Sequence, residues 1–386
     1  MADDVYVDGE LSGSGDTGVD WDNAHEGLAG LQDALDAVVD GNQTNMYIRN
    51  MTSQTVTAAI EVDAGGGSIA GNTWLDLIFC DSEGNEHPMG TREELDAEDN
   101  DLGKAILWIN GIENVRVWHC HAKDNHNGAD NTDHGIEVKN TAAKYNFVFI
   151  DCEASGCYDG FKFSDTSDTK CIMLFRCSSH DNTYYSVVDA SFIGSLYVDC
   201  YFKGSGTNGG VLHTYSAIFV NCIFEGGYYG NYHSSAYPDL MYGCTFINHT
   251  VSNIVQVGSS IAAACAIINC VGTVAVPASD AFVRIVTGDG SCLYCDYCIT
   301  DSENFTAAGG NPLVPGNAAG NNSQDSVTIT FADADNKDFT MVSDTLREAG
   351  SPDYLLNPRS IGAIAAIRRS KGSHRMMTQG NMLGVL

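Results

Sequence analysis

The chain has 386 residues, with 50 Asp and Glu against 19 Lys and Arg, which gives a formal charge of −31 at pH 7. A charge of this sign repels nucleic acids and anionic membranes, so no nucleic-acid partner is expected. No apolar run reaches the roughly 18 residues of a membrane span, and the first four residues lack the basic and apolar parts of a secretory signal. We therefore expect no membrane insertion and a protein made in a cytoplasm.

The first 44 residues predict a short strand followed by a capping helix. Val5 to Val7 form a strand-like run, and a glycine-rich loop follows. From Asp22 to Val39 apolar residues recur every three or four positions, Asp22 can cap the first turn, and Gly41 follows the end. This pattern predicts an amphipathic α-helix, which at the end of a stack of strands would cover unpaired strand edges.

Three strand-like runs and an acidic stretch come next. The runs lie near residues 46–48, 56–62 and 74–79 and predict irregular first coils. Residues 81–101 contain nine acidic side chains without an apolar period, which predicts a solvated loop. A Ca²⁺ ion could bind at this stretch, although the spacing matches no known calcium loop. No other cofactor is expected.

Seven cysteines, each at the end of a short apolar run, recur 22 to 32 residues apart. The residue before each cysteine is polar or Gly, while the residue before that is apolar. This alternation predicts a strand in which Val198, Cys200 and Phe202, for example, point to one face. The members of this cysteine ladder are Cys120, Cys152, Cys177, Cys200, Cys222, Cys244 and Cys270.

The length of the repeat predicts the fold. A unit of about 22 residues is too long for a hairpin and too short for a strand, helix and strand, but it can hold two or three short strands of a stacked coil. We therefore predict an all-β solenoid, a parallel β-helix over residues 45–324 with an N-terminal capping α-helix (1–44). Cys is small and often buried, so the ladder is expected to be an inert internal column.

Two further groups of cysteines leave alternatives open. Cys152 and Cys157 could form a disulfide. Cys292, Cys295 and Cys298 have two overlapping C-x-x-C spacings that suit Zn²⁺, but no second pair follows at ligand distance. Because residues 293–296 repeat the pattern of residues 196–199, we favour another coil there.

Histidines and tyrosines are the notable surface candidates. His119 and His121 flank Cys120 and are expected to point outward from one strand; an H-x-H pair can bind metal, but without a third ligand no metal site is predicted. Ten of the 17 tyrosines lie between Tyr184 and Tyr242. Their rings suit sugar rings or a neighbouring subunit. The predicted contact residues are Tyr184, Tyr185, Tyr228, Tyr229, Tyr232, His233 and Tyr237.

The C-terminal part divides into a closing segment and a tail. Residues 325–367 predict the closing segment, which includes a strand from Ser326 to Phe331. Residues 368–386 reverse the charge of the body and show no helical or strand period, which predicts an extension that docks on a partner. The docking residues are Arg368, Arg369, Arg375, Met376, Met377, Met382 and Leu383.

Three segments together resemble the right-handed, single-stranded parallel β-helix proteins of the pectate-lyase-like superfamily, and among them phage tailspikes and virion appendages. In this chain, Tyr6-Val7 with the following loop, and then Trp21, Ala24 and Leu31 to Leu35, are similar to the entry motif of such proteins. Their coils are similar to the cysteine ladder. Their closing segment is similar to Asp338-Phe339, Ala349-Gly350-Ser351-Pro352 and Ile361-Gly362-Ala363. The resemblance covers nearly everything from Val5 to Ala366 and implies a homotrimer.

The enzymes of this superfamily are matched only in part. Residues 131–133 (Asn-Thr-Asp) match a short polygalacturonase motif and residues 134–135 (His-Gly) resemble another, but here both fall in one loop. The paired aspartates and the Arg-x-Lys motif are missing. Inverting hydrolysis needs converging carboxylates, which one acid does not supply. A lyase needs a basic residue over a calcium-bound uronate, yet the coils carry few Lys or Arg.

The hypothesis that we favour is a non-enzymatic structural component of a phage virion, a head or tail appendage or capsid decoration protein assembled in the host cytoplasm. Its partners would be other capsid or tail proteins, further copies of itself and a host surface glycan. One alternative is a tailspike-type polysaccharide depolymerase, either a glycoside hydrolase or a lyase, and another is a surface carbohydrate-binding module. For an enzyme, the candidate acids in loops at coil edges are Asp159, Asp181, Asp189 and Glu225.

Overall fold

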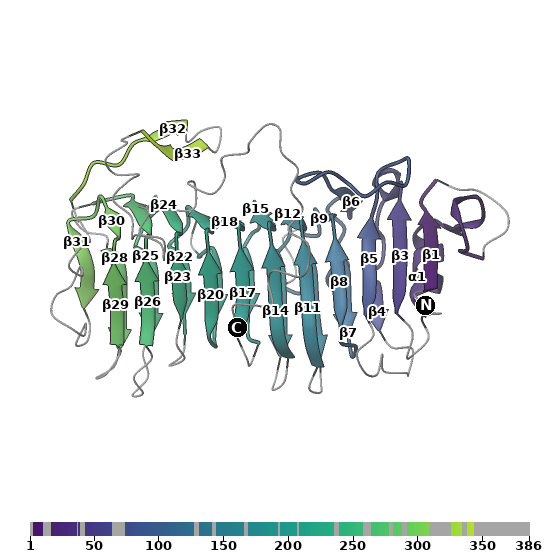
Figure 1. The fold of residues 1–386 in the computed structure, drawn as a ribbon, viewed down its shortest axis with the longest axis horizontal. Coiled ribbons are helices and arrows are strands. Elements are labelled where there is room, and N and C mark those ends of the chain that lie inside the picture. Colours follow the sequence, from purple (N-terminus) through teal and green to yellow (C-terminus); the bar gives the residue numbers. More distant parts are fainter. Residues whose placement is uncertain are drawn as a thin grey trace, which may run out of the picture.

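The computed structural model is an all-β protein in which short strands stack into three long parallel sheets, a parallel β-helix (Figure 1). The structure describes residues 3–342 with gaps. The residues outside the description are 1–2, 11–16, 37, 39–42, 64–73, 127–130, 141–143, 166–168, 192–193, 207, 235–238, 258–263, 278–280, 288–291, 309–325, 334–337 and 343–386. The predicted docking tail and Tyr237 therefore lie outside the described residues.

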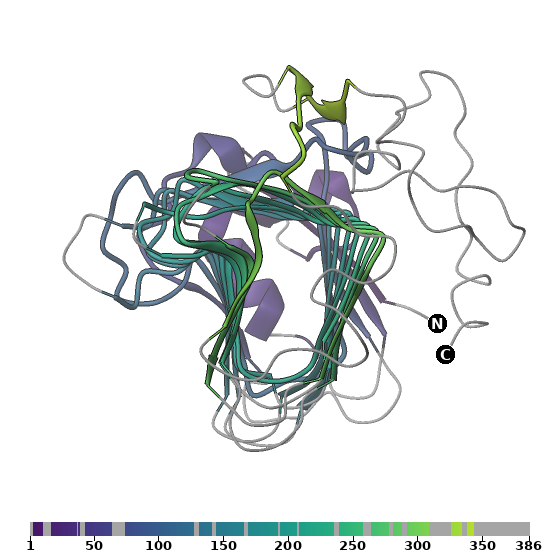
Figure 2. The same ribbon diagram turned by 90° about the vertical axis from the view of Figure 1, so that its left-hand side faces the viewer.

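Each regular coil adds one strand to each sheet in turn, and the coils superimpose as a three-sided tube (Figure 2). Sheet A has 12 strands: β1 (Asp3–Asp8), β2 (His25–Glu26), β3 (Thr44–Arg49), β5 (Leu75–Phe79), β8 (Val115–Trp118), β11 (Lys144–Ile150), β14 (Thr169–Phe175), β17 (Ser195–Val198), β20 (Ala217–Val220), β23 (Leu240–Tyr242), β26 (Ala264–Ile268) and β29 (Cys292–Asp296). Sheet B has nine: β6 (Glu93–Asp96), β9 (Cys120–Lys123), β12 (Glu153–Ser155), β15 (Ser178–His180), β18 (Tyr201–Lys203), β21 (Ile223–Glu225), β24 (Thr245–His249), β27 (Val271–Val274) and β30 (Ile299–Thr300). Sheet C has ten: β4 (Ile60–Asp63), β7 (Leu107–Asn110), β10 (Ile136–Asn140), β13 (Phe161–Asp165), β16 (Val187–Asp189), β19 (Val211–His213), β22 (Tyr229–His233), β25 (Ser252–Val257), β28 (Ala281–Thr287) and β31 (Asn304–Ala308).

The interior is built from side chains that stack on their equivalents in the next coil. In sheet B, Phe202, Phe224 and Phe246 are register partners, all fully buried. The rings of Phe224 and Phe246 stack with centroids 4.7 Å apart. Burying such a side chain stabilises the fold by about 1.5–3 kcal/mol. Because every coil repeats the arrangement, one continuous hydrophobic core runs along the tube.

The ladder cysteines lie at the bend between sheets A and B. The residue before each of them has a positive φ, such as Asp199 at 55°, and the strand of sheet A ends there. The prediction of a single strand running through the cysteine was therefore wrong. The bend resets the alternation, so that Tyr197 rather than Val198 faces inward next to Cys200. All seven predicted ladder cysteines are nevertheless buried, and Cys298 adds an eighth position.

Each ladder thiol from Cys152 onward donates to a backbone carbonyl of the preceding coil. The Sγ atom of Cys222 lies 3.4 Å from the carbonyl oxygen of Tyr197, and the same relation repeats along the ladder. Cys152 and Cys157 are both free, so they do not form the disulfide that the sequence left open. Residues 292–296 form strand β29, another coil as expected. Through the register of sheet A, Asp296 rather than Cys295 is equivalent to Val198, so the predicted alignment of residues 293–296 with residues 196–199 is off by one residue.

A helix covers the N-terminal end of the tube. The helix predicted from Asp22 is shorter in the structure, where α1 spans Gly27–Asp36, because the chain first forms a 3-10 turn (η1, Trp21–Asn23) and then pairs β2 with β1. Leu31 and Leu35 of α1 belong to the same core as the first coils, and the helix lies across one end of the tube (Figure 2). No helix in the described part of the chain is long and apolar enough to cross a membrane.

Near the other end, the chain returns over the outer face of sheet B. Val327, Ile329 and Phe331 pack against apolar side chains of that face such as Val271 and Ile299. The predicted strand from Ser326 to Phe331 is not formed before Phe331, where β32 (Phe331–Asp333) begins and pairs antiparallel to β33 (Asp338–Met341).

Candidate functional site

Two of the four candidate acids lie on strands, where the prediction of coil-edge loops was wrong. Asp189 on β16 points into the tube, and its carboxylate accepts hydrogen bonds from the Tyr197 hydroxyl at 2.7 Å and the Ser191 N–H at 2.8 Å. Glu225 on β21 accepts a hydrogen bond from the Tyr201 hydroxyl at 2.6 Å. Both carboxylates belong to residues of regularly paired strands and are fixed by hydrogen bonds to neighbouring side chains.

Asp159 lies buried in the bend before β13. Its Oδ1 accepts the Tyr185 N–H at 3.1 Å, and its Oδ2 lies 3.4 Å from Nδ1 of His134. Burial raises the pKa of the Asp159 carboxyl to about 6, against the lowering effect of Lys162. This carboxyl is therefore partly protonated near pH 6.

Asp181 differs from the other three because it is exposed. Its carboxylate pairs with His180 Nδ1 at 2.8 Å and with Lys203 Nζ at 3.2 Å. The four acids have different hydrogen-bond and ion-pair partners, although the Tyr201 hydroxyl that binds Glu225 is also close enough to Asp181 for that charge to help raise the Tyr201 pKa, after the larger effects of burial and Glu225.

Six tyrosines form an aromatic surface beside sheet C, called here the tyrosine face. Its members are Tyr158, Tyr184, Tyr185, Tyr228, Tyr229 and Tyr232. Tyr184 stacks on Tyr158 with centroids 5.1 Å apart and meets Tyr185 edge to face at 4.7 Å. Tyr229 and Tyr232 lie 5.4 Å apart and are close enough to Tyr185 to raise the pKa of its hydroxyl, after the larger effect of burial. Five of these six tyrosines are among the contact residues predicted from the sequence, and their contact with a sugar or a subunit stays a prediction.

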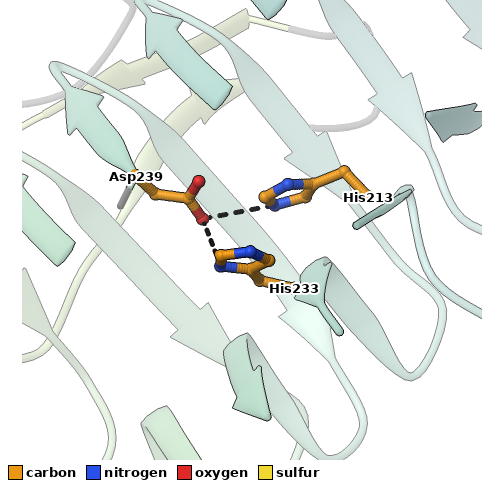
Figure 3. A group of neighbouring side chains, drawn as sticks. All are labelled: His213, His233 and Asp239. Atoms are coloured by element: carbon orange, nitrogen blue, oxygen red, sulfur yellow. Dashed lines mark ion pairs between the residues drawn. The ribbon is translucent and has the colours of Figure 1, made fainter. Parts of the chain in front are cut away.

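His233, predicted beside the tyrosines, lies inside the tube. Tyr232 faces outward on β22, so the strand alternation turns His233 inward, where it is fully buried. There it meets His213 of β19 and Asp239, the residue before β23 (Figure 3). The prediction of a surface contact for His233 was therefore wrong. We call His213, His233 and Asp239 the His–Asp group.

One carboxylate oxygen serves both imidazoles of the His–Asp group. Oδ2 of Asp239 lies 3.0 Å from Nδ1 of His233 and 3.3 Å from Nε2 of His213 (Figure 3). The two rings stack, with centroids 4.4 Å apart and 14° between their planes. Within the part of the chain that the structure describes, no other three His, Cys, Asp or Glu side chains bring their ligand atoms together in this way.

The coil repeat explains why the group assembles. His213 and His233 are register partners on neighbouring strands, so their rings stack at about the strand spacing of 4.8 Å. The side chain of Asp239 is fixed because its Oδ1 accepts the Ala217 N–H at 2.9 Å, and its carbonyl accepts the Ala266 N–H. All three positions are set by backbone structure.

The hydrogen bond of His213 Nδ1 determines whether His213 Nε2 faces Asp239 with a proton or with a lone pair. Nδ1 donates to the carbonyl oxygen of Tyr215 at 2.8 Å. A neutral His213 therefore turns the lone pair of Nε2 toward the Asp239 carboxylate. Burial lowers the pKa of His213, which opposes the protonation that would relieve this contact. Two buried acceptors consequently face each other.

The histidine pair proposed from the sequence is arranged differently. His119 occupies the left-handed bend (φ 59°), is buried and lies against His87. His121 faces outward on β9, and its Nε2 lies 2.8 Å from the Ser155 hydroxyl. The expectation that both point out of one strand was wrong, because the bend separates them.

The acidic stretch is partly a strand rather than a loop. β6 (Glu93–Asp96) pairs with β9, and Glu93 accepts the Thr52 N–H from the 3-10 turn η2 (Met51–Ser53). Asp81 accepts the Asn85 N–H within its own turn. These carboxylates stabilise the fold, and calcium binding there stays a prediction.

No protein-family model, no curated protein and no solved structure matches this chain. The class of the protein therefore comes from its own architecture, an all-β parallel β-helix.

Sequence reasoning missed His213 and Asp239. The signal was present, since His213 and His233 follow Gly-containing segments and lie 20 residues apart, close to the length of one coil. Aligning coils on sheet C, rather than on the cysteines alone, would have placed both histidines at the same inward position.

Proposed function

We propose that the protein is a non-enzymatic structural rod of a phage particle, a head or tail appendage of the tailspike-like kind, and that its tyrosine face binds a host surface glycan. The fold supports the structural part by analogy, because parallel β-helices serve both as scaffolds and as enzymes. The acidic charge is consistent with it.

The tyrosine face is the observation that carries the binding proposal. Tyr184 and Tyr228 are 38% and 39% exposed, respectively. Stacked and edge-on rings on successive coils present flat apolar surfaces with hydroxyl groups at their rims, which suits sugar rings.

The acids argue against a hydrolase as the first choice. A hydrolase needs two carboxyl groups across one sugar bond, about 5–9.5 Å apart. Asp189 lies in the interior, and Glu225 and Asp181 are each committed to separate partners. Among the described residues, no hydrogen bond or ion pair joins two of these acids.

Binding to a panel of purified bacterial capsular polysaccharides tests the proposal. We expect Tyr184→Ala with Tyr228→Ala to weaken binding of the recognised polymer roughly tenfold or more, because each lost ring removes about 0.5–1.5 kcal/mol of aromatic contact. Tyr47→Ala is the matched control, since Tyr47 is a partly exposed tyrosine that stacks on Tyr6 in sheet A. Equal affinity in both variants would contradict a glycan-binding role for the face.

A depolymerase is the second candidate, and Asp159 favours it. Its carboxyl has a pKa of about 6, lies under Tyr185 and belongs to the region of the tyrosine face. A group of this pKa can donate a proton near neutral pH. Turnover of the recognised polymer that Asp159→Asn abolishes without loss of binding would replace the first proposal with this one.

The proposed partners within a particle are other virion proteins and further copies of the chain in a homotrimer. Sedimentation of the purified protein as a monomer at micromolar concentration would contradict a free trimer. The docking tail lies outside the described residues, so its role as an anchor stays a prediction. Deleting residues 370–386 should leave the melting temperature unchanged and remove the protein from purified particles.

A further inference from the structure

We infer that the His–Asp group is a binding site for a divalent transition metal, with Zn²⁺ the expected ion. The inference is independent of the proposed function, because it concerns the interior of the tube and not its surface. The three ligand atoms would be His213 Nε2, His233 Nδ1 and Asp239 Oδ2, which all lie within 4.8 Å of one another.

The distances fit the edges of a metal coordination sphere. Tetrahedral Zn²⁺ binds imidazole nitrogen and carboxylate oxygen at about 2.0–2.2 Å, so neighbouring ligand atoms lie about 3.3–3.5 Å apart. Oδ2 of Asp239 is 3.3 Å from His213 Nε2 and 3.0 Å from His233 Nδ1. Small side-chain movements would suffice to admit an ion.

The hydrogen bonds around the group also favour a cation. His213 Nδ1 donates to the Tyr215 carbonyl, and Oδ1 of Asp239 accepts the Ala217 N–H. Ligands of metal sites are commonly oriented in this way by outer partners. The Nε2 atom of His213 and the Oδ2 atom of Asp239 are buried and make no hydrogen bond among the described residues. A cation between them would convert a repulsive contact into two bonds.

The donor set selects the class of metal. Two imidazole nitrogens and one carboxylate oxygen suit Zn²⁺ and other late transition metals, whereas Ca²⁺ and Mg²⁺ require oxygen ligands. Because all three residues are buried, the ion would be structural and would join two successive coils at the bend between sheets C and A. The alternative occupant is a proton on His213, and the experiment separates the two.

The test uses the full chain, freed of metal with a chelator and then titrated with Zn²⁺ by calorimetry. We expect one Zn²⁺ per chain, and affinities lower by about 100-fold or more in His213→Gln and Asp239→Asn, because each removes a direct ligand. The matched control is His249→Gln, since His249 is also a fully buried histidine inside the tube but donates to the Phe224 carbonyl. The control should bind Zn²⁺ like the wild type.

Co²⁺ provides a second measurement that does not depend on stability. The wild type should give the visible absorption of tetrahedral Co²⁺ without thiolate charge-transfer bands, and Asp239→Asn should abolish it. Asp239→Asn keeps the shape of the side chain and an oxygen for the Ala217 N–H, so it should fold, as circular dichroism can check. A wild type that binds neither ion, or a control that loses binding as much as Asp239→Asn, would overturn the inference.

Discussion

Two bends of the same tube are filled in opposite ways. At the bend from sheet A to sheet B every regular coil places one cysteine, and each thiol from Cys152 onward donates to the coil before it. At the bend from sheet C to sheet A, Asp189, His213 and His233 stack on successive strands and bring Asp239 with them. One bend repeats a single apolar residue, and the other concentrates polar groups in a few coils.

The difference shows what a coil needs from its neighbours. A cysteine needs only a small space and tolerates unlimited repetition. A buried carboxylate or imidazole needs partners, which cost free energy when they are missing. Asp189 finds them in Ser191 and Tyr197, whereas the His–Asp group satisfies itself only in part. A bound ion would therefore stabilise the coils of the His–Asp group more than the coils of the cysteine ladder.

The largest expected difference between the buried histidines and the ladder cysteines is in how much stability the fold loses in acid. Burial lowers the pKa of His249 from 6.5 to about 4, so the unfolded chain binds this proton first and stability is lost as the pH falls from 6.5 to 4. The shift corresponds to roughly 3 kcal/mol. We expect the free energy of unfolding, measured in urea with a chelator present, to fall between pH 7 and pH 4 in the wild type. In His249→Gln this fall should be smaller by about the same amount.

Cys152 and Cys222 of the cysteine ladder should add nothing to this pH dependence. Burial raises the pKa of Cys152 and Cys222 well above the ordinary value, so these thiols stay neutral throughout the acid range. Cys222→Ala should therefore lose as much stability between pH 7 and pH 4 as the wild type. A clearly smaller loss in this variant would contradict the assignment of the effect to histidine.

The next largest expected effect is the stabilisation of the folded chain by Zn²⁺, which should depend on the bend between sheets C and A and not on the cysteine bend. At a free Zn²⁺ concentration of 100 times the dissociation constant, binding stabilises the folded chain by about 2.7 kcal/mol. This gain should appear in the melting temperature of the wild type and of Cys222→Ala, and should vanish in Asp239→Asn. A gain lost in the cysteine variant instead would place the ion at the ladder.

The two bends also differ in how far the sequence predicted them. The cysteines repeat at seven coils, so their spacing was sufficient to predict the parallel β-helix and its core. The left-handed residue before each cysteine was missed, because Asp199 and its equivalents look like ordinary outward residues of a strand. The histidines of the His–Asp group recur in only two coils, so their spacing of 20 residues is a much weaker signal than that of the seven cysteines. Asp239 also joins it only through the folding of the chain at a bend.

Single substitutions in the ladder should have smaller effects. Cys222→Ser should destabilise the fold by about 1 kcal/mol, because the hydroxyl replaces an apolar sulfur but can still donate to the Tyr197 carbonyl. Cys222→Ala removes the donor and leaves a small cavity, so its cost should be similar or lower. Chemical denaturation measures both, and a loss above about 3 kcal/mol for serine would indicate that the hydroxyl finds no partner.

Thiol labelling should distinguish the ladder without changing stability. Cys120, Cys200 and Cys222 are buried and should react with a maleimide only after denaturation, because access limits them. Cys171 is only partly buried and should react in the native protein. Mass spectrometry of labelled peptides gives the positions. Fast native labelling of Cys222 would contradict the ladder.

X-ray absorption at the zinc edge of the zinc-loaded full chain tests the central contrast most directly. Bound zinc at the His–Asp group should have only nitrogen and oxygen neighbours, at about 2.0–2.2 Å. This result would establish that the polar bend binds the ion and the cysteine bend is inert packing. A sulfur shell at about 2.3 Å would contradict it, because the ion would then be held by the cysteines.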